Sequence, residues 1–207
     1  MLRGARRREM RLAQRDRVQA LAATVEPPTE PLVWRSGTTA RIAAVLWCVT
    51  FAALTVPPVG GSLAAPDIGG LVFAVWTSLV AGWAACRVAL WRVTADRDGV
   101  RVRRLWSTTF LSWSVISHVE ARRDGLLEFV GPPGEPMGGL FRPPWLSRRL
   151  GLPDTLGEVA DTLTAMALHP RLRAPAEADR ALSGTPFARW AIPLGLLLCL
   201  ARDLVHR

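Results

Sequence analysis

The sequence contains no lysine, no tyrosine and no asparagine, and it has only three cysteines. Its net charge of +9 therefore rests on arginine alone. Cys48, Cys86 and Cys199 each lie inside or beside an apolar run, with no ligand spacing between them. We expect them to be small packing residues, since nothing pairs them as a disulfide or a metal site. The three histidines are scattered as well, so the sequence predicts no metal and no cofactor. The bias toward Ala, Gly, Pro and Arg is typical of a high-GC bacterial genome.

Charge is also absent from two long stretches. No charged residue occurs between Arg41 and Asp67, or between Asp67 and Arg87. The second interval has 19 residues, which as a helix would extend about 28 Å, close to the ~30 Å hydrocarbon core of a bilayer. We predict a transmembrane helical hairpin over residues 34–87, with spans at about 42–57 and 68–86 and a turn at 60–62.

Two alternatives attach to this hairpin. Ser62-Leu63-Ala64 resembles a signal-peptide cleavage site, but the 41-residue leader is long for a signal peptide and a second apolar run follows. Small residues also recur at four-residue spacing in the second run, as in Ser78 and Gly82. Such spacing lets two helices approach closely. We expect the partner to be the first span, with a homodimer as the alternative.

Charge distribution predicts the orientation of the hairpin. Residues 1–41 hold nine arginines and four acids, residues 87–186 hold fourteen and eleven, and the connector holds only Asp67. The positive-inside rule places both basic flanks in the cytoplasm. We predict an integral protein of the cell (inner) membrane, with Trp34 and Arg41 as interfacial anchors. Neither span contains an ionisable residue, which does not favour a proton relay or a transporter site.

Residues 1–33 are predicted to form a basic cytoplasmic tail and a Pro-rich linker. Seven arginines within the first 24 residues favour a basic helix. It could be solvated, lie on anionic lipid, or bind nucleic acid; no aromatic residue is interleaved for stacking, so nucleic acid is the least favoured. The prolines between Glu26 and Pro31 then act as a stiff linker.

After Leu90 the hydrophobic pattern changes to that of short strands. Val100 and Val102 alternate with Arg101 and Arg103 after an Asp98-Gly99 turn, as expected of a strand with one buried face. The pattern predicts strands at 90–95, 100–103, 110–122 with a bend near Trp113, 126–130 and weakly 135–137, then a loop at 138–152 and an amphipathic helix from Pro153 to His169.

Several antiparallel strands followed by one helix suggest a sheet covered on its apolar face. Residues 88–170 resemble the bacterial PH domains of the low-molecular-weight protein antigen 6 type, common in actinobacterial membrane proteins. The resemblance rests on the run from Val93 to Val100, on Trp113-Ser114-Val115-Ile116 with Val119, and on the terminal helix. It implies an α+β fold: a PH-like small antiparallel β-barrel or sheet capped by a C-terminal α-helix, preceded by two spans. Val115 replaces a frequent acidic residue, and no activity is attached to the family.

Residues 171–207 are predicted to be a tail with a short apolar helix at 187–205. Its apolar stretch from Trp190 to Ala201 would extend only about 18 Å. An interfacial or sheet-packing helix and a third, short span both remain open.

No catalytic residue is predicted, and we expect no enzyme. Ser117 faces away from His118 and Glu120 on a strand, so the three do not converge. Four arginines form the only candidate binding face, for anionic lipid headgroups, with a solvated face as the alternative. They are Arg92, Arg97, Arg101 and Arg103. Trp106, Trp113 and Trp145 are expected in the core or at the membrane interface.

The sequence thus predicts a membrane-anchored PH-like binding or scaffold protein. Its partners would be the lipid bilayer, anionic lipid headgroups and a protein of unknown identity. The alternatives are an accessory subunit of a cell-envelope or transport complex, or a membrane-bound enzyme.

Overall fold

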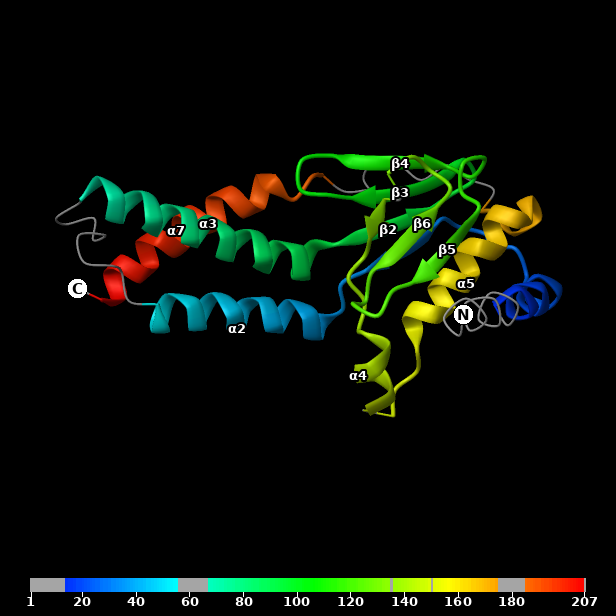
Figure 1. Ribbon diagram of the computed structural model, residues 1–207, viewed down its shortest axis with the longest axis horizontal. Coiled ribbons are helices and arrows are strands. Elements are labelled where there is room, and N and C mark those ends of the chain that lie inside the picture. Colours follow the sequence, from blue (N-terminus) through cyan, green and yellow to red (C-terminus); the bar gives the residue numbers. More distant parts are fainter. Residues whose placement is uncertain (1–13, 56–66, 135, 150, 175–184, 207) are drawn as a thin grey trace, which may run out of the picture. The chain divides into compact units, whose positions relative to one another are not determined.

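The computed structural model describes residues 14–55, 67–134, 136–149, 151–174 and 185–206. The fold is α+β (Figure 1). The chain forms two compact units, which interleave along the sequence. The strand unit comprises residues 1–34, 92–102 and 109–184, and the helical unit comprises 35–91, 103–108 and 185–207.

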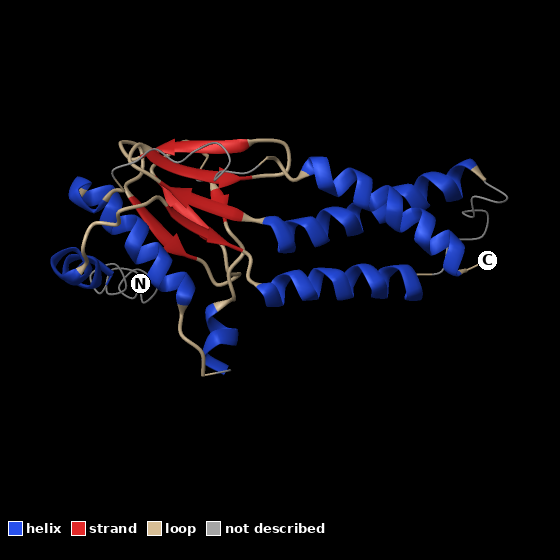
Figure 2. Cartoon of the chain, turned by 180° about the vertical axis from the view of Figure 1, so that it is seen from behind, coloured by secondary structure: helices blue, strands red, loops and turns tan. Residues whose placement is uncertain are grey.

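The helical unit contains three long helices that lie side by side (Figures 1 and 2). They are α2 (Thr38–Leu54), α3 (Ile68–Leu90) and α7 (Ala188–Val205). The Asp67 carboxylate accepts a hydrogen bond from the backbone N–H of Gly70 at 3.1 Å and so begins α3. The predicted second span is thus a helix, four residues longer than expected at its end. The predicted turn at 60–62 lies outside the described residues.

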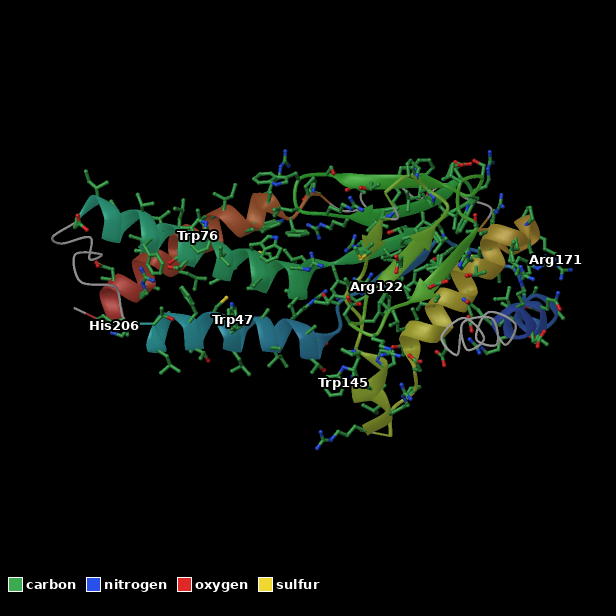
Figure 3. All side chains as sticks on the ribbon, in the orientation of Figure 1. Trp47, Trp76, Arg122, Trp145, Arg171 and His206 are labelled. Carbon is green, nitrogen blue, oxygen red and sulfur yellow. The ribbon has the colours of Figure 1, made fainter. Side chains whose placement is uncertain are left out.

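Within the helical unit, α3 makes its most extensive contact with α7. A Cβ atom added at Gly82 would lie 2.8 Å from the backbone nitrogen of Gly195, and one added at Gly195 would lie 2.8 Å from the Cα of Leu79. The two helices therefore touch through their backbones. The predicted small-residue contact of α3 exists, but its main partner is α7 and not the first span. The first span, α2, contacts α3 through a hydrogen bond from the Trp47 indole N–H to the Ala81 carbonyl at 3.2 Å (Figure 3).

The three helices are built with small residues inside and large ones outside. The buried positions of α3 are Ala74, Ser78, Ala81, Gly82, Ala85 and Cys86. Bulky apolar side chains on all three helices are exposed, among them Val45, Leu46 and Val49 on α2, Val72, Phe73 and Trp76 on α3, and Ile192, Leu197 and Leu200 on α7. This distribution is the reverse of a water-soluble bundle. By length and composition, α3 is the one helix among the described residues able to cross a membrane.

The strand unit holds two small antiparallel sheets that stay open and do not close into a barrel. One sheet has the order β1-β2-β3-β4 and the other the order β5-β6-β7. Their bounds are β1 Leu32–Arg35, β2 Arg92–Ala95, β3 Gly99–Arg103, β4 Thr108–Ser112, β5 His118–Ala121, β6 Leu127–Val130 and β7 Met137–Gly138. The Asp98-Gly99 turn joins β2 to β3 as predicted, with Val93 opposite Val102. Val100 and Val102 are buried on β3, which confirms the alternation.

Three local predictions are corrected by the structure. The expected bent strand at 110–122 is two strands, because residues between Ser112 and His118 turn the chain from one sheet into the other. The loop expected at 138–152 contains the short helix α4 (Pro144–Arg149), which proline at its first position favours. Strand β1 lies in the stretch that was assigned to the linker and the hairpin, and it pairs with β2.

The core of the strand unit lies between the sheets and α5 (Thr155–Leu168). Asp154 caps this helix and His169 ends it, as predicted, and its buried face includes Leu156, Leu163 and Met166. Beyond the end of α5, the short 3-10 helix η1 (Pro170–Leu172) leads to Arg173.

Part of the basic N-terminal segment belongs to this core. Residues 14–24 form a helix whose Val18 and Ala22 are buried against the sheets. The Arg17 guanidinium contacts Asp161 at 2.8 Å, and an Arg171 N–H donates to the Ala22 carbonyl at 2.6 Å (Figure 3). This helix is therefore a packed element, not the solvated tail that its arginines suggested. Residues 1–13 lie outside the described part.

Candidate functional site

The predicted arginine face on β3 is largely turned toward internal partners. Arg101 pairs with the buried carboxylate of Asp96 and lies over the Phe110 ring, 5.3 Å from its centroid. The same carboxylate accepts the backbone N–H groups of Asp98 and Gly99, each at 3.0 Å, and so closes the β2–β3 turn. Arg101 thus stabilises the hairpin, and 18% of its side chain is exposed.

The other three arginines of the predicted face have different surroundings. Arg103 donates to the Leu90 carbonyl at 3.0 Å and to the Thr185 carbonyl, and all three residues belong to the helical unit. Arg97 is 69% exposed and lies 3.5 Å from an Asp98 oxygen. Arg92 is half-buried on β2. Of the four, Arg97 offers the most surface to a headgroup, and the contact of this set with lipid stays a prediction.

A groove in the strand unit brings chemically versatile side chains together. It lies between helix 14–24, the beginning of β5 and the end of α5, and its volume is about 590 Å³. Its lining residues are Gln14, Arg15, Val18, Gln19, Ser117, His118, Thr164, Leu168 and His169. Pockets of about 300–1,000 Å³ are the usual size for small ligands.

The floor of the groove is fixed by hydrogen bonds to the edge strand β5. The Thr164 hydroxyl accepts the Val119 backbone N–H at 3.0 Å and donates to the Ala160 carbonyl at 2.7 Å. The Gln14 amide donates to the Val119 carbonyl at 3.0 Å. These side chains satisfy backbone groups that point away from β6, so the edge of the sheet is closed by α5 and by the N-terminal helix.

The imidazole of His118 is held at one side of the groove. Its Nε2 lies 3.0 Å from a carboxylate oxygen of Glu120, its neighbour on the same face of β5. This confirms the predicted common face of His118 and Glu120 and fixes the orientation of the ring. Ser117 lines the groove too, although it was expected to face away from His118, and the described interactions include no hydrogen bond between its hydroxyl and His118.

Two further arginines of the strand unit have structural surroundings. Arg173 donates to the Met166 and Ala167 carbonyls at 2.9 and 3.0 Å, which caps the end of α5, and burial lowers the pKa of its guanidinium. Arg122 contacts Asp124 at 3.2 Å on the β5–β6 hairpin (Figure 3), and the nearby carboxylate raises the pKa of Arg122. Both therefore stabilise local structure.

A second polar cluster lies inside the helical unit. Arg202, near the end of α7, is 2% exposed, and its Nη1 donates to the Thr77 hydroxyl at 3.3 Å. Its guanidinium lies 5.9 Å from the centre of the Phe51 ring. Asp203, the next residue in the sequence, is also buried.

The positions of three residues in their helices agree on how far along the helices this cluster lies. Phe51 is 13 residues from Thr38, Thr77 is 13 from Leu90, and Arg202 is 14 from Ala188. These three helix ends lie at the same end of the unit, so the guanidinium is about 20 Å along the bundle.

Sequence reasoning missed both polar sites for identifiable reasons. The sequence left open whether the helix at 187–205 is a third span, and no local pattern placed Arg202 among other helices. The groove joins residues up to 155 positions apart, from Gln14 to His169, and no local pattern indicates that juxtaposition. None of the arginines predicted to contact lipid lines the groove.

Comparisons with known proteins add no relative. No protein-family model matches the chain, and no curated protein or solved structure is significantly similar to it. The PH-like resemblance therefore stays a prediction from the sequence.

Proposed function

We propose that this protein is a membrane-anchored binding or scaffold module. Its helical unit would be embedded in the inner membrane, with α7 as a third helix of the anchor beside α2 and α3. Its strand unit would be a cytoplasmic PH-like domain that presents the groove to a ligand or partner. Two small antiparallel sheets with α5 against them support the PH-like proposal, because this is the strand-then-helix order of the resemblance.

One observation carries the proposal. Trp76 and Phe73, near the middle of α3, are 61% and 55% exposed, whereas Ala74 and Ser78 between the helices are fully buried. Large apolar side chains lose nothing when they face lipid tails, but they are costly when they face water in such numbers. Backbone contact at small residues is how helices associate where lipid, and not water, surrounds them.

The proposal is tested by placing a charge on the outer face of α3. Trp76→Arg should reduce membrane insertion, because an arginine at the centre of a spanning helix costs about 2.5–3.5 kcal/mol on insertion scales. Trp106→Arg is the matched control: Trp106 is 72% exposed in the β3–β4 loop, where a charge meets water or headgroups. Alkali-resistant membrane association of each variant is the measurement. Equal retention of both variants in the membrane would contradict an embedded α3.

Reporter fusions test the orientation separately. Fusions at residue 65 and residue 130 should report opposite sides of the membrane, and a fusion after residue 206 should report the same side as residue 65. If 65 and 130 report one side, the hairpin is wrong; if only the C-terminal fusion disagrees, α7 lies outside the membrane.

Purification distinguishes two roles, that of an accessory subunit in a protein complex and that of a module that is anchored in lipid without a protein partner. The full chain, solubilised in mild detergent, should retain a stoichiometric protein partner if its role is accessory. A membrane-bound enzyme is the less favoured alternative, and detection of a reaction catalysed by the purified full chain would favour it over the binding module.

A further inference from the structure

The groove of the strand unit has a lining with a one-sided charge. Arg15 and the imidazoles of His118 and His169 line it, and none of the lining residues in the described part of the chain is a carboxylate. Two carboxylates on the same elements are already engaged, since Asp161 contacts Arg17 and Glu120 contacts His118. The described lining therefore offers the Arg15 guanidinium and two imidazole rings to whatever enters it.

The remaining lining residues define the rest of the ligand. The amides of Gln14 and Gln19 and the Ser117 hydroxyl can donate to or accept from polar groups. Val18 is buried beneath them and Leu168 is 54% exposed, so part of the wall is apolar. A bare phosphate would occupy a small fraction of about 590 Å³, which leaves room for a hydroxylated organic group attached to it.

We infer that this groove binds a phosphate ester, with Arg15, His118 and His169 around the phosphate and the two glutamines near the organic part. A guanidinium presents its donors in a fork that fits phosphate oxygens, and charge-assisted hydrogen bonds of this kind are short and strong. The ester could be a soluble metabolite or the headgroup of a phospholipid, since both carry the same chemistry. The inference rests on the proposed role of the strand unit as a binding module.

The histidines supply the test with an internal control. The chain has three: His118 and His169 line the groove, and His206 is exposed near the end of the chain. Full-length protein in neutral detergent, labelled only at histidine, should give three imidazole signals by NMR. Titration with inorganic phosphate and then with glycerol 3-phosphate should shift the signals of His118 and His169 in a saturable way and leave His206 unchanged. Glycerol 3-phosphate should saturate at lower concentration.

Two variants sharpen the result. Arg15→Gln should raise the midpoint of the titration roughly tenfold or more, because a hydrogen bond to a charged group contributes about 1.5–3 kcal/mol. Arg97→Gln, an exposed arginine of the same unit outside the groove, should leave the midpoint unchanged. The inference is overturned if sodium chloride at matched ionic strength shifts the signals equally, if all three histidines respond alike, or if Arg15→Gln has no effect.

Lipid composition separates the two sources of the phosphate ester. In nanodiscs of phosphatidylcholine with added phosphatidylglycerol, shifts at His118 and His169 without soluble ligand would assign the groove to a lipid headgroup. Shifts with glycerol 3-phosphate alone would assign it to a soluble ester. The membrane test on Trp76 is independent: if Trp76→Arg and Trp106→Arg are retained in the membrane equally while the histidine shifts persist, the anchor is refuted and the groove is kept.

Discussion

We expect the hydroxyl of Thr164 to contribute more to the stability of the protein than any other threonine hydroxyl of α5. It accepts the backbone N–H of Val119 at 3.0 Å in a buried environment, and it belongs to the floor of the groove. Thr164→Val keeps nearly the same shape and removes the acceptor. The Val119 N–H points away from β6 and would be left buried without a partner.

The magnitude follows from that orphaned donor. A buried backbone N–H without a partner costs about 1–3 kcal/mol. Thr162→Val is the control on the same helix: the Thr162 hydroxyl donates to the Glu158 carbonyl at 2.8 Å, but that bond is exposed and water can replace it. We expect a change within about 0.5 kcal/mol for Thr162→Val.

Hydrogen exchange of the full-length protein in detergent measures this difference. The slowest amides of β6 and α5 should exchange about 5- to 150-fold faster in Thr164→Val than in the wild type, since each 1.4 kcal/mol is a factor of ten. Thr162→Val should remain close to wild type. Equal exchange in the two variants would refute the idea that Thr164 closes the β5 edge.

Three further predictions concern buried contacts. Gly82→Ala should destabilise the α3–α7 contact by about 1–3 kcal/mol, because the added Cβ would lie 2.8 Å from the Gly195 backbone nitrogen; denaturant unfolding in detergent measures this. Gly69→Ala is the control: its added Cβ would lie 3.4 Å from an Asp67 carboxylate oxygen, so this variant should be neutral or more stable. Arg202→Met should cost about 1–3 kcal/mol in the same assay, because it removes the hydrogen bond to the Thr77 hydroxyl and the contact with the Phe51 ring; an unchanged midpoint would contradict this. Asp96→Ala should lower the stability of the strand unit by about 3 kcal/mol or more, because it removes two backbone hydrogen bonds and the ion pair with Arg101. Faster hydrogen exchange of the β2 and β3 amides in the variant than in the wild type is the measurement.

Much of the strand unit followed from local patterns. The Asp98-Gly99 turn, the alternation of Val100 and Val102, and the start of α5 at Asp154 each depend on a few neighbouring residues, so the sequence predicted them correctly. The bent strand at 110–122 was wrong because periodicity reports which face a residue takes, and it does not report which sheet the strand joins.

The candidate sites could not be read in the same way. Groove residues come from helix 14–24, β5 and α5, and only tertiary packing brings Gln14 to Val119 and Arg15 near His169. Of the arginines predicted to contact lipid, Arg101 and Arg103 were chosen for their alternation on one strand, and Arg92 and Arg97 because they are near it in the sequence. The sequence could not show that Arg101 turns to Asp96, because that contact depends on the geometry of the turn.

The amino-acid sequence by itself determined the apolar character of the long helices, the Asp98-Gly99 turn and the amphipathic face of α5, since these arise from interactions over a few residues. Only the tertiary structure decided which helices touch. Gly195 lies 113 positions after Gly82, and the two meet because neither has a side chain to keep the backbones apart. The same contact brings α7 against α3 and places Arg202 beside Thr77 between the helices. The two apolar runs contain no charged residue, so they had predicted no charge inside the bundle.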